Sequence, residues 1–256
     1  MKKVISGALV LALVSALGFP GLGDLTGALD SNSKTGGRLS AGLDVVKAAT
    51  IDDKEIATYA SQYATYSDKT NKVAPASSSY AQRLERLTSK FKKEDGLKLE
   101  FKAYLNPAIN AFSLADGSIR VNSGLMDAMD DDELLSVIGH EIGHIKLGHS
   151  KSRFRTAYLA SAARKVGTSA VGGGVAGKLA ADQLGGLGES LVKAQFSQDN
   201  EKDADDYGLK FLKKHGFKSG ASSAALRKIA ATGSKGGLLS THPDPEARAK
   251  RLDKQI

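Results

Sequence analysis

The hydrophobic positions between residues 80 and 103 change from a helical period to a strict alternation. The first apolar residues recur every three or four positions, which predicts an amphipathic helix that ends before Gly96. These residues are Tyr80, Leu84, Leu87 and Phe91. The apolar residues that follow alternate with charged ones, as in a half-buried strand, and they are Leu97, Leu99, Phe101 and Ala103. The chain is therefore expected to enter a sheet after this helix.

Two short apolar stretches, 109–114 and 119–122, predict the rest of the sheet. They flank the tetrapeptide Ala115-Asp116-Gly117-Ser118. An Asp-Gly pair supplies the positive backbone dihedrals that a tight hairpin needs. We therefore expect a small antiparallel sheet, with the segment 110–114 as an edge strand.

A capped helix is predicted after the hairpin. Asp130 followed three residues later by Glu133 is a capping-box signature. A helical run of apolar residues continues from there, and the helix is expected to reach about His149. The run comprises Leu134, Leu135, Val137, Ile138, Ile142, Ile145 and Leu147.

The remaining segments predict helices joined by polar or glycine-rich connections. From 25 to about 76 the chain is polar, and we expect a linker and then a helix near 44–66, packed on the outside of the domain. Glycine is frequent from 167 to 188, which is expected to interrupt any long helix there. Further helices are predicted at about 196–215, ending at Gly216, and at 219–231, and Pro243 is expected to open the last one.

The N-terminus resembles a secretory signal. Lys2 and Lys3 precede an uncharged apolar stretch, 4–17, which is short for a membrane-spanning helix. Small residues permit cleavage after Ala16 or Gly18, and the alternative is an uncleaved anchor helix. We therefore predict a signal peptide (1–18), a linker with an N-terminal helix (19–74) and one folded domain (75–256), exported to the periplasm and soluble or attached to a membrane surface.

Composition limits the chemistry. The chain contains no cysteine, which excludes disulfides, thiol nucleophiles and cysteine-ligated metal sites, so any metal must use His, Asp or Glu. The formal net charge is +8, but the basic residues are scattered and few aromatic residues accompany them. Nucleic acid is therefore not an expected partner.

The predicted helix that ends near His149 contains a metal-binding pattern. His140 and His144 lie four residues apart and share a helix face, so both imidazoles can bind one zinc ion, with Glu141 beside them as a general base. An extended motif that would supply a third histidine fails, because Leu147 and Ser150 occupy the required positions. His149 is expected to be structural or to support a ligand.

Two later segments supply candidate partners. Glu201 and Asp205 lie one helical turn apart, so one carboxylate can bind zinc while the other accepts a hydrogen bond from a ligand histidine. His242, followed by Pro243, and Arg248 near zinc could stabilise an oxyanion. Each segment alone has a plainer interpretation, a solvated helix face for the first and a surface helix start for the second.

Taken together, these motifs resemble the gluzincin peptidases that include the CAAX prenyl protease and the HtpX protease. The resemblance covers about 75–251 and adds three motifs: Asn110-Ala111-Phe112, Gly124-Leu125 and the residues around the histidine pair. It implies one Zn²⁺ per chain on His140, His144 and Glu201. It further implies Glu141 as general base, oxyanion contacts from His242 and Arg248, and Asp205 as the partner of His140.

We therefore expect a mostly helical α+β fold, a minigluzincin-like domain whose small antiparallel sheet lies above the active-site helix. The expected activity is zinc-dependent endopeptidase cleavage of misfolded or unassembled exported proteins, in envelope quality control. Polypeptide substrates are expected to pair with the edge strand at Asn110, Ala111 and Phe112. The alternatives are a chaperone-like binding factor that hydrolyses little and, more narrowly, an aminopeptidase.

Overall fold

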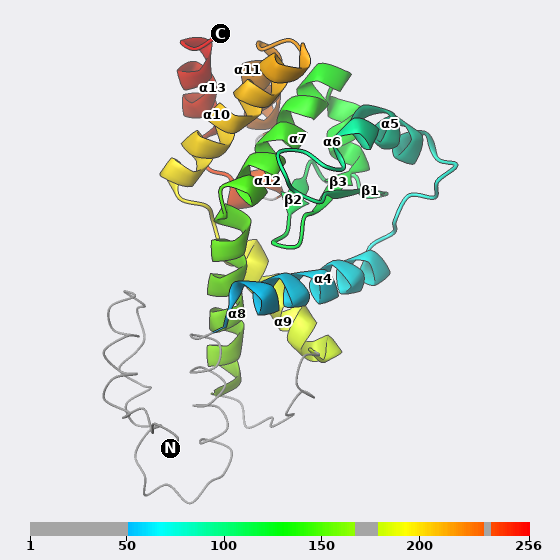
Figure 1. Ribbon diagram of the computed structural model, residues 1–256, viewed down its shortest axis with the longest axis vertical. Coiled ribbons are helices and arrows are strands. Elements are labelled where there is room, and N and C mark those ends of the chain that lie inside the picture. Colours follow the sequence, from blue (N-terminus) through cyan, green and yellow to red (C-terminus); the bar gives the residue numbers. More distant parts are fainter. Residues whose placement is uncertain (1–50, 167–178, 233–236) are drawn as a thin grey trace, which may run out of the picture.

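The computed structural model describes residues 51–166, 179–232 and 237–256, and most of them are helical (Figure 1). The elements are α4 (Asp53–Thr70), α5 (Ser79–Thr88), a 3₁₀ turn (Ser89–Phe91), β1 (Glu100–Tyr104), β2 (Ala111–Ser113), β3 (Ser118–Asn122), α6 (Ser123–Ala128), α7 (Asp131–Lys146), α8 (His149–Val166), α9 (Ala181–Lys193), α10 (Gln198–His215), α11 (Ala221–Ala231), α12 (Leu238–Thr241) and α13 (Pro245–Asp253). The expected signal peptide and most of the linker lie outside the described residues. Within the described ranges, no helix is both long and apolar enough to cross a membrane.

The three-stranded sheet is mixed, so the expected antiparallel sheet is wrong for one strand. The strand order is β1-β3-β2, in which β2 pairs with β3 antiparallel while β1 pairs with β3 parallel. The segment 105–110 reverses the chain and carries it past the central position to the far edge. Hydrogen bonds hold this crossing segment, because Asn122 N–H donates to Asn110 O at 3.0 Å and Gly124 N–H donates to Asn106 O at 2.9 Å. The fold is nevertheless the expected α+β class.

The expected hairpin between β2 and β3 is confirmed. Leu114 O accepts the N–H of Gly117 at 3.2 Å, and Leu114 N–H donates to Ser118 O at 2.9 Å. Gly117 has a φ of +96°, and a Cβ there would lie 2.0 Å from Lys98 O. Asp116 adds a side-chain bond to Ser118 N–H at 3.1 Å. Of the Asp-Gly pair, only the glycine needs the positive dihedral.

The capping box at the start of α7 is also confirmed. Asp130 accepts the N–H of Glu133 at 2.9 Å, and the Glu133 carboxylate accepts the N–H of Asp130 at 2.8 Å. The helix ends at Lys146, before the expected His149, because Gly148 adopts a φ of +78°. His149 instead begins α8. The chain therefore changes direction at Gly148, just after the histidine pair, and continues as α8.

Glycines allow α7 and α10 to pack unusually closely. A Cβ on Gly143 would lie 3.0 Å from Tyr207 Cβ, and one on Gly208 would lie 3.1 Å from the backbone nitrogen of His140. A Cβ on Gly139 would meet the ring of Phe211 at 2.8 Å. Contacts this short leave no room for larger side chains. The two helices that carry the candidate ligands are therefore held at one separation.

Two hydrophobic clusters surround this helix pair. The larger lies between the sheet and α5, α7, α10 and α11. The smaller joins α4 to α8 and α9 and includes Ile56, Tyr59 and Leu187, and Figure 1 shows α4 crossing both helices. Helix α4 begins at Asp53 and extends beyond the expected end. Its buried face fixes it to the domain.

The C-terminal half corrects two expectations. Helix α9 continues through Gly185, Gly186 and Gly188, because small residues fit against α4, where a Cβ on Gly188 would lie 3.1 Å from Tyr63 Oη. The other glycines of 167–188 lie outside the described residues. The last helix begins at Pro245, and Pro243 precedes it. By contrast, the expected end of α10 is confirmed, because Gly216 caps it with a φ of +73°.

Candidate metal centre

The two histidines of α7 point to a common centre. His140 Nε2 and His144 Nε2 lie 3.0 Å apart, close to the roughly 3.3 Å that separates two nitrogens bound to one tetrahedral zinc ion. Both side chains are buried, and the residues lie one turn apart on the helix. Burial and the neighbouring His140 lower the pKa of His144 well below its ordinary value. A neutral imidazole is the form that binds a metal.

Glu201 completes this cluster from the first turn of α10. Its Oε1 lies 3.4 Å from His144 Nε2, and its Oε2 lies 3.7 Å from His140 Nε2. Ser197 caps α10 by accepting the N–H of Asn200 at 3.1 Å. This cap fixes the helix start, where the helix dipole favours a carboxylate. Burial raises the pKa of Glu201, but His242 and His144 outweigh it and hold that pKa well below the usual range.

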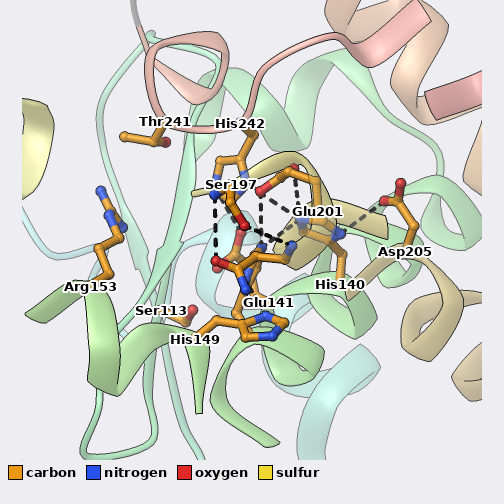
Figure 2. A network of polar contacts seen from close by, with 12 residues as sticks. Ser113, His140, Glu141, His149, Arg153, Ser197, Glu201, Asp205, Thr241 and His242 are labelled. Carbon is orange, nitrogen blue, oxygen red and sulfur yellow. Dashed lines mark hydrogen bonds and ion pairs between the residues drawn. The ribbon is translucent and has the colours of Figure 1, made fainter. Parts of the chain in front are cut away.

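Asp205 lies one turn further along α10 and holds the other side of the His140 ring (Figure 2). Its Oδ1 is 3.0 Å from His140 Nδ1. Burial raises the pKa of Asp205, but the hydrogen bonds from His140 and Arg248 outweigh it and keep the pKa well below its ordinary value. Asp205 therefore remains an anion that orients the His140 ring through the nitrogen that does not face the cluster.

Arg248 of α13 lies behind the two carboxylates. Its Nε and Nη2 donate to Asp205 at 2.9 and 2.6 Å, and its Nη1 contacts Glu201 Oε2. The guanidinium is thus engaged by the carboxylates of α10. Its expected contact with an oxyanion stays a prediction.

His242, directly after α12, brings a fourth donor atom to the cluster. Its Nδ1 lies 3.0 Å from Glu201 Oε1 and 3.3 Å from His140 Nε2. One ligand atom from each of His140, His144, Glu201 and His242 lies within 4.8 Å of the others. The sequence pattern predicted a catalytic role for His242 near the metal, and the structure adds that its Nδ1 lies among the ligand atoms.

Glu141 faces the cluster with an uncommitted carboxylate. The residue is 1% exposed, and among the described residues no group donates a hydrogen bond to either of its oxygens. His242 Nε2 lies 3.5 Å from Glu141 Oε1, and that nitrogen also has no hydrogen-bond partner in the described chain. A buried carboxylate normally has hydrogen-bond partners, so both groups are suited to water or substrate.

The donor set fits zinc. Two imidazoles and one carboxylate are a common set of protein ligands in catalytic zinc sites, which leave one position for water or substrate. The centre is buried, and an unpartnered carboxylate adjoins it. His140, His144 and Glu201 would therefore hold the ion.

The expected substrate strand lies at the edge of the sheet. In the described part of the chain, β2 pairs only with β3 and packs beside α7. The bonds of Asn110 O and Leu114 N–H toward β3 mean that the main-chain groups of Ala111 and Ser113 point to the free edge. Ala111 is buried, and Asn110 and Phe112 are partly exposed. Their expected contact with substrate stays a prediction.

Three further side chains adjoin the cluster near His144, and of these only His149 had an expected role, as a structural residue or as support for a ligand. His149 Nδ1 lies 3.2 Å from His144 Nδ1, the ring of Phe196 stacks on the His144 imidazole, and Arg153 lies over Phe196. The four-residue spacing of His149 and Arg153 on one helix face was the available signal. Nothing in the sequence placed Phe196 beside α8.

The comparisons with known proteins agree with this geometry. The model of peptidase family M48 matches residues 78–256. The chain is 37% identical to the metalloprotease LoiP of Escherichia coli over 86% of this chain and 88% of LoiP. It is 34% identical to the metalloprotease YcaL of the same species, over 85% and 86% of the two chains. A more distant match, at 28%, is the beta-barrel assembly-enhancing protease of E. coli, over 60% of this chain and 34% of that protein. The chain therefore belongs to peptidase family M48 and is a metalloendopeptidase.

Proposed function

We propose that this protein is a zinc-dependent endopeptidase that cleaves misfolded or unassembled polypeptides in the periplasm. One observation carries the proposal. The nitrogens of His140 and His144 and the carboxylate of Glu201 converge within 4.8 Å, beside the unpartnered carboxylate of Glu141. This arrangement combines a ligand set with a proton acceptor.

The chain's own residues divide the work of hydrolysis. Zinc, when bound by His140, His144 and Glu201, would polarise the scissile carbonyl and lower the pKa of a bound water to about 7. Glu141 accepts a proton from the attacking water through one carboxylate oxygen and then delivers it to the leaving amine.

His242 and Arg248 assist from the other side of Glu201. His242 Nε2, which has no hydrogen-bond partner among the described residues, is suited to donate to the developing oxyanion when it carries a proton. Such a donor is worth roughly 3 kcal/mol in the transition state. Arg248 holds Asp205 and Glu201 in place, and its positive charge favours the same oxyanion.

The substrate backbone pairs with the free edge of β2 in this proposal. The N–H and C=O groups of Ala111 and Ser113 offer main-chain hydrogen bonds, which recognise an extended peptide with little regard to its side chains. Asn110 precedes Ala111, Phe112 lies between the two residues, and both contact the substrate. Broad recognition of extended chains suits substrates that have lost their fold.

The cellular role is proposed from the N-terminus and from the names of the relatives. Lys2 and Lys3 followed by an apolar stretch favour export, and one of the relatives is named a beta-barrel assembly-enhancing protease. We therefore propose envelope protein quality control in the periplasm, with attachment to the membrane surface as one mode of localisation.

Metal analysis combined with casein cleavage tests this function. Purified wild type is expected to contain one zinc per chain and to cleave casein. Glu141→Gln is expected to keep the zinc and lose at least a hundredfold in rate, because an amide does not accept the proton. A chaperone-like factor would instead suppress client aggregation equally well in both proteins without cleaving casein. Retained cleavage by Glu141→Gln would remove Glu141 from the mechanism.

A further inference from the structure

The ring of Phe196 contacts a proposed zinc ligand, His144. Its ring stacks on the His144 imidazole with the centroids 3.8 Å apart and the planes inclined by 20°. Phe196 is buried, and it immediately precedes Ser197, the cap of α10. Its N–H donates to Thr241 O at 3.1 Å. One aromatic residue thus contacts His144, adjoins the start of the helix that carries Glu201, and ties that start to the turn before His242.

Arg153 of α8 in turn holds Phe196. Its guanidinium carbon lies 4.8 Å from the centre of the Phe196 ring, within the range of a cation–π interaction. Its Nε donates to Ala194 O at 2.8 Å and its Nη2 to Leu191 O at 2.6 Å. These carbonyls belong to the end of α9, where helices leave acceptors unpaired. Arg153 therefore fixes the connection from α9 to α10 on which Phe196 lies.

One face of α8 supports His144 through two side chains, one directly and one through Phe196. His149 and Arg153 are four residues apart, so their side chains lie on the same side of α8. His149 Nδ1 lies 3.2 Å from His144 Nδ1, while Arg153 acts through Phe196. In Figure 2, Arg153 and Asp205 lie on opposite sides of the cluster. Asp205 orients His140, and the α8 face occupies the corresponding place next to His144.

We propose that Arg153 and Phe196 are positioning residues that hold the His144 ring in its metal-binding orientation and set Glu201 at the distance a shared ion requires. The inference rests on the proposed zinc site and deepens it. The stacked Phe196 ring opposes rotation of the His144 imidazole about its Cβ–Cγ bond. The arginine fork opposes movement of the segment that precedes α10. Neither residue touches the reacting atoms.

Zinc affinity measures this role directly. We would titrate metal-free wild type, Arg153→Met, Arg153→Lys and Phe196→Leu with zinc against a competing chelator, and record the visible spectrum of the Co²⁺-substituted forms. Arg155→Met is the matched control on α8, because Arg155 pairs with exposed Asp53. Phe217→Leu is the matched aromatic control, because a lysine also lies over the Phe217 ring. Thermal unfolding of each metal-free variant reports folding separately.

Arg153→Met and Phe196→Leu are expected to bind zinc about tenfold more weakly than wild type and to change the Co²⁺ spectrum, as for other groups that orient metal ligands. Arg153→Lys, which keeps the charge but loses the planar fork, should fall between them and wild type. Wild-type affinity and an unchanged spectrum in Phe196→Leu and Arg153→Lys would overturn the inference, even if Arg153→Met does not fold. Zinc binding without casein cleavage by wild type would contradict the proposed function and leave this inference standing.

Discussion

Arg248 donates two hydrogen bonds to the carboxylate of Asp205, from Nε at 2.9 Å and from Nη2 at 2.6 Å. The same carboxylate lies 3.0 Å from His140 Nδ1. Helix α13 therefore supports a proposed ligand on α7 through one residue of α10. Because the pair is buried, loss of either partner leaves an uncompensated charge.

Removal of Glu201 should weaken zinc binding more than removal of Asp205. Asp205→Ala is expected to lose about 10 to 100-fold in zinc affinity, because His140 keeps its ligand atom but loses its orientation. Glu201→Ala loses a ligand and should bind more weakly still. Competition with a chelator measures both, with Asp206→Ala as the control on the same helix. Equal zinc occupancy in Glu201→Ala and wild type would refute the ligand assignment.

Backbone methylation of a peptide substrate should reveal pairing with β2. Only every second residue of a strand directs its main-chain groups to one neighbour. N-methylation at alternate positions should therefore lower kcat/KM about tenfold, the cost of one lost hydrogen bond, and the intervening positions should tolerate it. A loss that does not alternate along the peptide would argue against strand addition. Alanine replacements at the same positions separate side-chain effects.

The contact between α4 and the sheet should weaken in acid. Asp68 accepts hydrogen bonds from Arg120 Nε and Lys102 Nζ, both at 2.8 Å. Burial raises the pKa of Asp68, but these bonds outweigh it and leave the pKa below its ordinary value of 3.8. A carboxyl with a lower pKa in the folded state stabilises the fold above the unfolded pKa, and this contribution is lost as pH falls through the folded pKa.

Asp68→Asn should therefore unfold more easily than wild type at neutral pH, by about 2 kcal/mol. The difference should shrink as the pH falls below about 4, the ordinary range of an aspartate. Urea unfolding at a series of pH values measures it. Glu85→Gln, which removes an exposed pair with Lys92, serves as the control and should change stability little. A difference that does not depend on pH would contradict the assignment.

Alanine at two helical glycines should have opposite effects. A Cβ on Gly208 would press on the backbone of His140, whereas a Cβ on Gly186 would have no atom within 4 Å. Gly186→Ala is therefore expected to raise the free energy of unfolding by about 0.5 to 1 kcal/mol, as in other helices. Gly208→Ala should lower that free energy and weaken zinc binding, because α10 must move away from α7. Equal stabilisation by both would show that the helices separate freely.

Export is tested by cell fractionation and N-terminal sequencing. A cleaved signal predicts periplasmic protein that begins at Leu17 or Phe19, according to whether cleavage follows Ala16 or Gly18. Membrane recovery with Met1 intact would favour an uncleaved anchor. Cytoplasmic protein with Met1 intact would overturn the localisation.

Local patterns predicted those parts of the molecule that depend on local geometry. The pairing of His140 with His144 follows from helix periodicity. The capping box begins α7 and Gly216 ends α10, and each of these signals involves only a few neighbouring residues. The direction of β1 could not be predicted, because a half-buried strand alternates in the same way in parallel and antiparallel pairs. Likewise, no spacing rule relates Phe196 to Arg153, since their contact depends on how α8 and α9 pack. Tertiary packing decides these features.

The close glycine crossing of α7 and α10 has a consequence for the newly made chain. The histidine pair is complete once α7 has formed, but Glu201 arrives only when a later helix settles against Gly139 and Gly143. A chain that is still being synthesised or is still unfolded therefore carries the histidine motif without the third proposed ligand. Hydrolytic activity is then a property of the finished tertiary structure, in which α7 and α10 are packed together.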